Sequence, residues 1–166
     1  ETKTGVTTFF IDDKIDTGAM ILSKETPISS TESAGELHDR LMAIGSEAVV
    51  ETLALIEKGN VVTTIQTDSS DIKTAYKLNK DNCKIDFSKS GFEIYNLIRG
   101  LSPYPSAWCF FKDGTEEWNV KLYEAKLVEE SHNFEVGSII TTKKEIKIAV
   151  NNGFLEILSL QFPGKK

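Results

Sequence analysis

Five short apolar runs between positions 107 and 161 constrain the fold of this chain most strongly. They cover residues 107–112, 117–128, 137–142, 145–151 and 154–161. Turn-forming residues separate them, and Asn152-Gly153 is the strongest hairpin signal in the chain, since Asn-Gly suits a two-residue turn. Closely spaced strands joined by turns are typical of sandwiches and barrels. We therefore expect a small β-barrel in this half of the chain.

One short helix is expected just before these strands. Ser90 and Glu93 have the spacing of a capping box, in which each side chain accepts from the other residue's backbone N–H. Pro103 and Pro105 end the helical pattern, because the residue before a proline disfavours helical geometry. The apolar side chains at helical spacing are Ile94, Leu97, Ile98 and Leu101.

The first sixty residues have a different pattern, with two strands followed by one long helix. Residues 6–11 and 19–22 are apolar runs of strand length. Ser33 and Glu36 form a second potential capping box, and Gly59 is placed to end the helix. The apolar positions of this helix are Leu37, Leu41, Ile44, Ala48 and Leu55. Two strands and one helix are too few to bury a full core, so we expect further strands to come from elsewhere.

The segment between the two halves is rich in Thr, Ser, Asp and Lys and has no sustained periodicity. This composition is typical of a linker. The predicted organisation is therefore a domain over residues 1–60, a linker over 61–82 and a second domain over 83–166.

Asp16 is the first candidate for chemistry. It lies in Asp16-Thr17-Gly18, at the end of a predicted strand, where side chains leave the core and can meet a ligand. Asp before Gly is also ordinary turn chemistry. Aspartic proteases use the same tripeptide but need a second carboxylate at close range, which here only a homodimer would supply. The residues alone leave these alternatives open.

Four further motifs follow Asp16 in one order along the chain. They are Lys77-Leu78-Asn79-Lys80, Ile85-Asp86-Phe87-Ser88, the run from Ile98 to Trp108, and the ending from Leu158 to Lys166. Together with Thr4-Gly5-Val6-Thr7 and the Asp16 loop, they resemble the methionyl-tRNA formyltransferase family of folate-dependent enzymes. Phe87 departs from the usual Trp of the family and should still supply an aromatic core residue.

The resemblance implies a fold of class α/β followed by mostly β. In it, the tail of a Rossmann-like formyltransferase domain is joined by a linker to an OB-like β-barrel domain. The implied reaction transfers a formyl group from 10-formyltetrahydrofolate to the amino group of initiator methionyl-tRNA. Asp16 would be catalytic, orienting a histidine and a water, and Gly18 would lie in the loop near the folate. No metal is implied.

The resemblance also implies an incomplete chain. The family places its folate-binding segment, with the Asn and His that act with Asp16, upstream of Gly5-Val6-Thr7. We therefore expect a carboxyl-terminal portion of an enzyme, without measurable transferase activity alone. Sister enzymes that formylate sugar nucleotides share the first half, and only the ending from Leu158 to Lys166 argues against them.

Charge is distributed unevenly along the chain. Residues 1–60 contain 5 Lys+Arg and 11 Asp+Glu, whereas residues 83–166 contain 11 of each. A tRNA partner requires a local basic surface, so a neutral domain must cluster its lysines. The candidates are Lys143, Lys144, Lys147, Lys165 and Lys166. The alternative for these lysines is a solvated surface of mixed charge. The alternative for the chain as a whole is a pure RNA-binding or assembly module.

The remaining features are negative. No apolar run approaches the ~18 residues of a membrane span, and the start does not resemble a signal peptide. Cys83 and Cys109 lack metal-ligand or redox spacing, so we expect buried free thiols. His38 and His132 are isolated, on a predicted helix face and in a predicted loop. We expect a cytoplasmic enzyme that is monomeric when complete and has no membrane partner.

Overall fold

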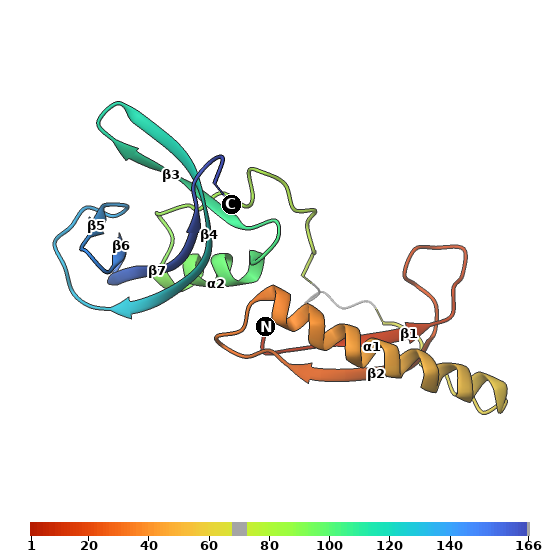
Figure 1. The fold of residues 1–166 in the computed structure, drawn as a ribbon. Coiled ribbons are helices and arrows are strands. Elements are labelled where there is room, and N and C mark those ends of the chain that lie inside the picture. The colour runs from red at the N-terminus through yellow and green to blue at the C-terminus, as the bar shows by residue number, and fades with distance from the viewer. Residues whose placement is uncertain (68–72, 166) are drawn as a thin grey trace. The chain divides into compact units, whose positions relative to one another are not determined.

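A computed structural model describes residues 1–67 and 73–165 of the chain (Figure 1). It divides into two compact units, which are described separately. Unit 1 comprises Glu1–Glu32 and Glu36–Tyr76, and unit 2 comprises Ser33–Gly35 and Lys77–Lys166. The predicted boundaries at residues 60 and 82 stay predictions.

Unit 1 is built on an antiparallel hairpin, as the two apolar runs predicted. Strand β1 (Lys3–Phe9) pairs with β2 (Met20–Pro27), with Lys3 opposite Pro27 and Phe9 opposite Met20. β1 ends before the predicted limit at Ile11. Beyond Phe9, the Phe10 N–H donates to the Ala19 carbonyl, and a loop follows over residues 11–18.

Helix α1 (Ala34–Glu57) begins directly after Ser33 and ends before Gly59, which has φ +66°. Its predicted apolar face is confirmed, since Leu37, Leu41, Ile44, Ala48 and Leu55 are all buried or half-buried. Two polar contacts fasten this helix to the hairpin. The Thr52 hydroxyl lies 2.7 Å from that of Thr8, and Lys24 Nζ lies 2.8 Å from a Glu51 oxygen.

Arg40 fastens the start of α1 to the end of β2. Its guanidinium donates two hydrogen bonds to the buried Glu32 carboxylate, at 2.6 and 2.9 Å, and others to Thr26 and the Pro27 carbonyl. The hydrogen bonding that Arg40 donates to the Glu32 carboxylate raises the pKa of Arg40 further above its ordinary value. Such a two-pronged contact fixes the helix direction.

A second apolar face of α1 is uncovered by the part of the chain that the structure describes. Its side chains are between 42% and 69% exposed, and they are Met42, Val49, Val50, Leu53 and Ile56. This agrees with the prediction that two strands and one helix do not bury a full core.

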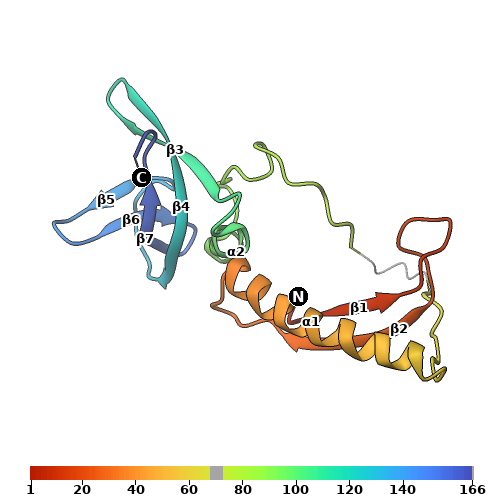
Figure 2. The ribbon, with the colours of Figure 1, turned by 45° about the vertical axis from the view of Figure 1, so that its right-hand side comes forward.

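Unit 2 is a five-stranded antiparallel sheet in the order β3-β4-β7-β6-β5 (Figure 2). The strands are β3 (Ala107–Asp113), β4 (Glu116–Glu129), β5 (Ile139–Thr141), β6 (Ile146–Val150) and β7 (Gly153–Gln161). The register of β4 against β7 shifts around Glu124. Such bulges bend a strand, and the sheet curls into a half-barrel. The five predicted strands are confirmed, whereas a closed OB-like barrel stays a prediction.

Helix α2 (Gly91–Leu101) packs against β4, β7 and β3 of unit 2. Its capping box is present as predicted, with the Ser90 hydroxyl accepting from the Glu93 N–H and the Glu93 carboxylate accepting from the Ser90 N–H. Ile94 and Ile98 are almost fully buried, together with Val120, Leu122, Ile148, Val150 and Leu155. Phe87 packs against this core, which confirms its expected role.

The hairpin between β6 and β7 is confirmed, but its loop lies one residue earlier than predicted. Val150 pairs with Gly153, so Asn151 and Asn152 form the loop, and Asn152 has φ 63°. Gly153 belongs to β7, since it pairs with Val150 of β6 and with Glu129 of β4. A Cβ there would lie 2.3 Å from the Val128 carbonyl oxygen of β4. Glycine is required here by the neighbouring backbone rather than by the turn.

Within the predicted linker, residues 61–67 and 73–82 contain no long helix or strand. Thr64 forms an isolated bridge with Met20, with backbone hydrogen bonds of 2.8 and 2.9 Å. The part of the predicted linker over 68–72 lies outside the described residues.

Candidate functional site

The loop between β1 and β2 is held by its own side chains. The Asp12 carboxylate accepts from the Thr17 hydroxyl at 2.8 Å and from the Lys14 N–H at 3.0 Å. Gly18 is placed so closely against Phe10 that a Cβ would lie 1.5 Å from the Phe10 carbonyl oxygen. The loop therefore returns to the hairpin through a position that only glycine fits.

Asp16 lies at the turn of this loop, with φ 56°. Its side chain is exposed, and within residues 1–67 and 73–165 its carboxylate has no hydrogen-bond or ion-pair partner. Its backbone is fixed, however, because Gln66 Nε2 donates to the Asp16 carbonyl at 3.0 Å and to the Gly18 carbonyl at 2.8 Å. Sequence reasoning missed Gln66, which lies fifty residues away in a stretch without periodicity. The Asp16 backbone is therefore held in place by Gln66, while its carboxylate is exposed to solvent.

Lys143, Lys144 and Lys147 are brought together on one hairpin, at and after the turn between β5 and β6. The Thr142 hydroxyl accepts from the N–H groups of Lys144 and Glu145, which orders this turn. Lys147 Nζ lies 3.3 Å from a Glu145 oxygen, so part of its charge is neutralised. Lys143 and Lys144 are exposed.

Lys165 lies at the other predicted basic position, beyond β7. Its N–H donates to the Phe162 carbonyl, and its own carbonyl accepts from Gln161 at 2.7 Å. These contacts curl the chain after the strand. Lys166 lies outside the described residues.

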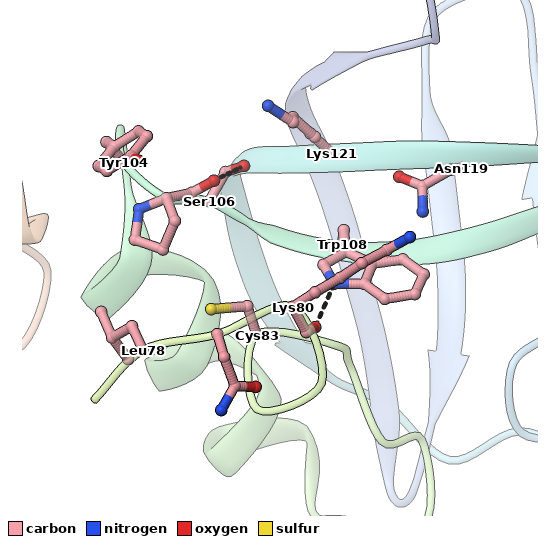
Figure 3. A pocket seen from close by; sticks show the side chains of 10 residues that line it. Leu78, Lys80, Cys83, Tyr104, Ser106, Trp108, Asn119 and Lys121 are labelled. Atoms are coloured by element: carbon pink, nitrogen blue, oxygen red, sulfur yellow. Dashed lines mark hydrogen bonds between the residues drawn. The ribbon is translucent and has the colours of Figure 1, made fainter. Parts of the chain in front are cut away.

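Unit 2 contains a pocket of about 390 Å³ that sequence reasoning did not find (Figure 3). Its lining comes from the segment before α2, from the turn after α2, and from β3 and β4. The ten lining residues are Leu78, Asn79, Lys80, Cys83, Tyr104, Pro105, Ser106, Trp108, Asn119 and Lys121. The Trp108 indole N–H donates to the Lys80 carbonyl at 2.8 Å, which holds the wall together.

The cysteines and histidines take structural positions. Cys83 and Cys109 are buried and free, as predicted, and burial raises the pKa of the Cys109 thiol to about 12. His38 lies exposed on α1 beside Asp39. His132 Nε2 lies 2.9 Å from the Val150 carbonyl and 2.8 Å from that of Gly153, so it braces the β6–β7 hairpin.

Among the described residues, no group of three His, Cys, Asp or Glu side chains could hold a metal ion. No helix in the same part of the chain is both long and apolar enough to cross a membrane.

Comparison with protein families gives a match over both units. Residues 77–166 match the family model described as formyl transferase, C-terminal domain, and residues 1–53 match the model described as formyl transferase. The first of these alone covers more than half of the chain.

Several curated relatives match the whole chain, two of them from the genus Flavobacterium. The methionyl-tRNA formyltransferase of Flavobacterium johnsoniae is 70% identical over 166 residues, covering 100% of this chain and 53% of the relative. That of Flavobacterium psychrophilum is 69% identical over 166 residues, covering 100% and 52%. The chain thus spans about half the length of the curated relatives it matches.

A solved structure shows the same fold. The N-formyltransferase of Helicobacter canadensis, in complex with folinic acid and dTDP-3-aminofucose, superposes with a TM-score of 0.71 at 23% identity. The match covers 97% of this chain and 57% of that one.

Proposed function

The chain belongs to the formyl transferase family, and on that basis we propose that it is part of an enzyme that formylates the amino group of initiator methionyl-tRNA. The family uses folate-derived formyl donors, and we assign 10-formyltetrahydrofolate as the donor here. The observation that carries the proposal is the 70% identity to a methionyl-tRNA formyltransferase over the whole chain.

The proposed reaction needs three kinds of assistance. The amine that attacks the formyl carbon loses a proton, the carbonyl oxygen gains negative charge, and the folate nitrogen gains a proton as it leaves. We assign Asp16 to the first step, where its carboxylate would orient an imidazole and a water. Its exposed carboxylate, on a backbone held by Gln66, supports this role. Gly18 would keep the loop close to the folate.

We propose that tRNA contacts unit 2 through phosphates. Lys143, Lys144 and Lys147 share one hairpin, and Lys165 and Lys166 lie near the end of the chain, so each could meet a phosphate of a large ligand. The half-barrel would be an OB-like domain over 83–166, joined by the linker 61–82 to the catalytic portion 1–60. The enzyme would act as a cytoplasmic monomer without a metal.

The leading alternative is formylation of a sugar nucleotide. It is favoured by one observation, the fold shared with an enzyme solved with dTDP-3-aminofucose. That structure is only 23% identical, however, so it supports the fold alone. The aspartic-protease alternative for Asp16-Thr17-Gly18 has no support from a family match.

Replacing Asp16 by Asn tests the proposal in the protein at its natural length. We expect formyl transfer to methionyl-tRNA to fall by roughly a hundredfold or more, because loss of a charge that orients an imidazole costs up to about 10⁴ in the Ser-His-Asp enzymes. The circular dichroism spectrum should be unchanged.

The matched control is Asp13→Asn, which removes an exposed carboxylate from the same loop. It should keep most of the activity. If Asp16→Asn also kept more than half, Asp16 would be a turn residue without a catalytic role.

A further inference from the structure

Asp16 adopts a backbone conformation that needs support from its surroundings. Its φ of 56° lies in the left-handed region, which residues with a Cβ disfavour, although Asp tolerates it better than most. A non-glycine residue keeps such a conformation where the surrounding structure holds it there. The contacts that hold the Asp16 backbone therefore also decide where its carboxylate points.

The hydrogen bonds formed within the loop hold other residues. The Asp12 carboxylate accepts from the Thr17 hydroxyl and from the Lys14 N–H, so it orders the loop on either side of Asp16. Across the described residues, the side chain that hydrogen-bonds the Asp16 backbone is that of Gln66. Support for the candidate catalytic residue thus comes from outside its own loop.

The side-chain amide of Gln66 joins two carbonyls of the loop. Its Nε2 donates to the Asp16 carbonyl at 3.0 Å and to the Gly18 carbonyl at 2.8 Å. A primary amide has two N–H donors, so one is available for each carbonyl. Because a carbonyl oxygen can only accept, the nitrogen end of the amide must face the loop. We call this pair of hydrogen bonds the Gln66 clamp.

The backbone that carries Gln66 is fixed to the same hairpin. Two residues earlier, Thr64 exchanges backbone hydrogen bonds of 2.8 and 2.9 Å with Met20, the first residue of β2. Met20 lies two residues after Gly18 in the chain. The clamp therefore connects the loop to backbone that the hairpin itself holds in place.

The chemistry of an amide suits this position. Gln66 donates to carbonyl oxygens and brings no charge, so the Asp16 carboxylate keeps its full capacity to accept from an imidazole. A lysine or arginine here could also donate to the carbonyls. Its positive charge, however, would compete with the imidazole for the carboxylate.

We propose that Gln66 is a positioning residue for the formyl transfer assigned above. The Gln66 clamp holds the backbone of the loop so that the Asp16 carboxylate stays where it orients the imidazole. Gln66 acts through Asp16 and not on the substrates. The inference rests on the proposed function for the role of Asp16. Loss of such positioning changes the reacting geometry rather than substrate binding.

The kinetic test is Gln66→Glu in the protein at its natural length. This substitution keeps the side-chain shape but replaces both N–H donors by a carboxylate, whose oxygens repel the two carbonyls. The kcat for formyl transfer should fall roughly ten- to a hundredfold, since a misplacement of 1 Å can cost about 10². The KM for methionyl-tRNA should stay close to the native value. Gln66→Met, which removes the donors without adding charge, should lower kcat less.

The charge-matched control is Thr63→Glu. It adds the same negative charge at an exposed position of the same segment and leaves the Gln66 clamp intact. Its kcat should equal that of the native protein. An equal fall of kcat in Gln66→Glu and Thr63→Glu would assign the effect to charge and overturn the proposal.

A double-mutant cycle with Asp16→Asn separates positioning from a merely structural role. If Gln66 acts through Asp16, adding Gln66→Glu to Asp16→Asn should change kcat by less than about twofold. A structural role would lower kcat by the same factor in both backgrounds. Losses that multiply would therefore overturn the proposal.

Hydrogen exchange in the 166-residue chain tests the clamp without any reaction. The amides of residues 11–18 should exchange roughly two- to tenfold faster in Gln66→Glu than in Thr63→Glu, as the loss of an ordinary hydrogen bond implies. Unchanged exchange, with an active natural-length enzyme, would contradict the proposal and leave the proposed function standing. Absence of formyl transfer by the native protein would contradict the function, and faster exchange in Gln66→Glu would then still support the clamp.

Discussion

At the scale of single residues, the candidate catalytic loop depends on contacts that its own sequence does not reveal. The family motif around Asp16 led to its assignment as a catalytic residue, and Gly18 follows in the same tripeptide; both roles stay predictions. Gln66 could not be predicted, since its two hydrogen bonds to the loop carbonyls join residues far apart in the chain. Gly153 shows the same limit, because a neighbouring strand requires the glycine that the sequence pattern assigned to the turn.

The first residue-scale prediction concerns Gly18→Ala. An added Cβ would meet the Phe10 carbonyl oxygen at 1.5 Å, so the backbone must move, at a cost of about 1–3 kcal/mol. The Phe10 amide, which closes the loop, should exchange with solvent about tenfold faster or more. Hydrogen exchange followed by mass spectrometry measures this.

Gly100→Ala is the matched control, because a Cβ at that position of α2 meets nothing within 4 Å. It should leave the loop unchanged and stabilise the helix by about 0.8–1.0 kcal/mol. If the Phe10 amide exchanged as slowly in Gly18→Ala as in the control, the close packing of Gly18 against the Phe10 carbonyl oxygen would be contradicted.

At the scale of elements, local signals were the most reliable. Both helix starts lie where Ser33 and Ser90 predicted, and all five strands of unit 2 occur in the predicted order, since turn residues and period-two patterns act over short distances. The position of the loop between β6 and β7 was wrong by one residue, since Gly153 pairs with Val150 instead of lying in the loop. The backbone of β4 packs closely against Gly153, and the local sequence does not show this contact. Whether the half-barrel closes depends on long-range contacts that no local pattern encodes.

The capping box of α2 gives an element-scale prediction. Ser90→Ala removes the hydroxyl that accepts from the Glu93 N–H, which should lower the free energy of unfolding by about 0.5–2 kcal/mol. Ser90→Thr should restore most of it. Urea unfolding followed by the fluorescence of Trp108 and Trp118 measures both variants.

The same cap predicts a pH dependence. Hydrogen bonds from the Ser90 hydroxyl and N–H lower the pKa of Glu93 below its ordinary value of 4.5. The contribution of the Glu93 carboxylate to the free energy of unfolding is therefore fully present above pH 4.5. It is lost as the pH falls through the lowered pKa, because the carboxylate is then protonated. In Ser90→Ala this acid-dependent part of the stability should shrink, and an unchanged acid profile would contradict the role of the cap.

The hairpin between β5 and β6 gives the second element-scale prediction. Replacing Lys143, Lys144 and Lys147 by Gln should weaken tRNA binding and flatten its salt slope by about 0.7–0.9 for each of these lysines that binds a phosphate. Lys147 should contribute least, because Glu145 lies 3.3 Å from it. Filter binding across a salt series measures the slope, and folate binding should be unchanged. An unchanged slope would leave these lysines as a solvated surface.

At the scale of the whole molecule, the sequence supported a family more firmly than a complete fold. Motifs spread from Thr4 to Lys166 predicted the match that both family models confirm. The size argument predicted that two strands and one helix would not bury a full core, and the 61% exposure of Leu53 on α1 agrees with it. The pocket lined by Trp108 and Lys121 could not be predicted, because its walls come from segments far apart in the sequence that only the folded chain brings together.

The most direct test of the central claim is a choice between acceptors. The protein at its natural length would receive 10-formyltetrahydrofolate with either methionyl-tRNA or a dTDP-linked 3-amino sugar, and kcat/KM would be measured for each. We predict a preference for methionyl-tRNA of at least about a thousandfold, since buried polar groups left unpaired reject the wrong substrate strongly. Equal or faster transfer to the sugar nucleotide would contradict the account.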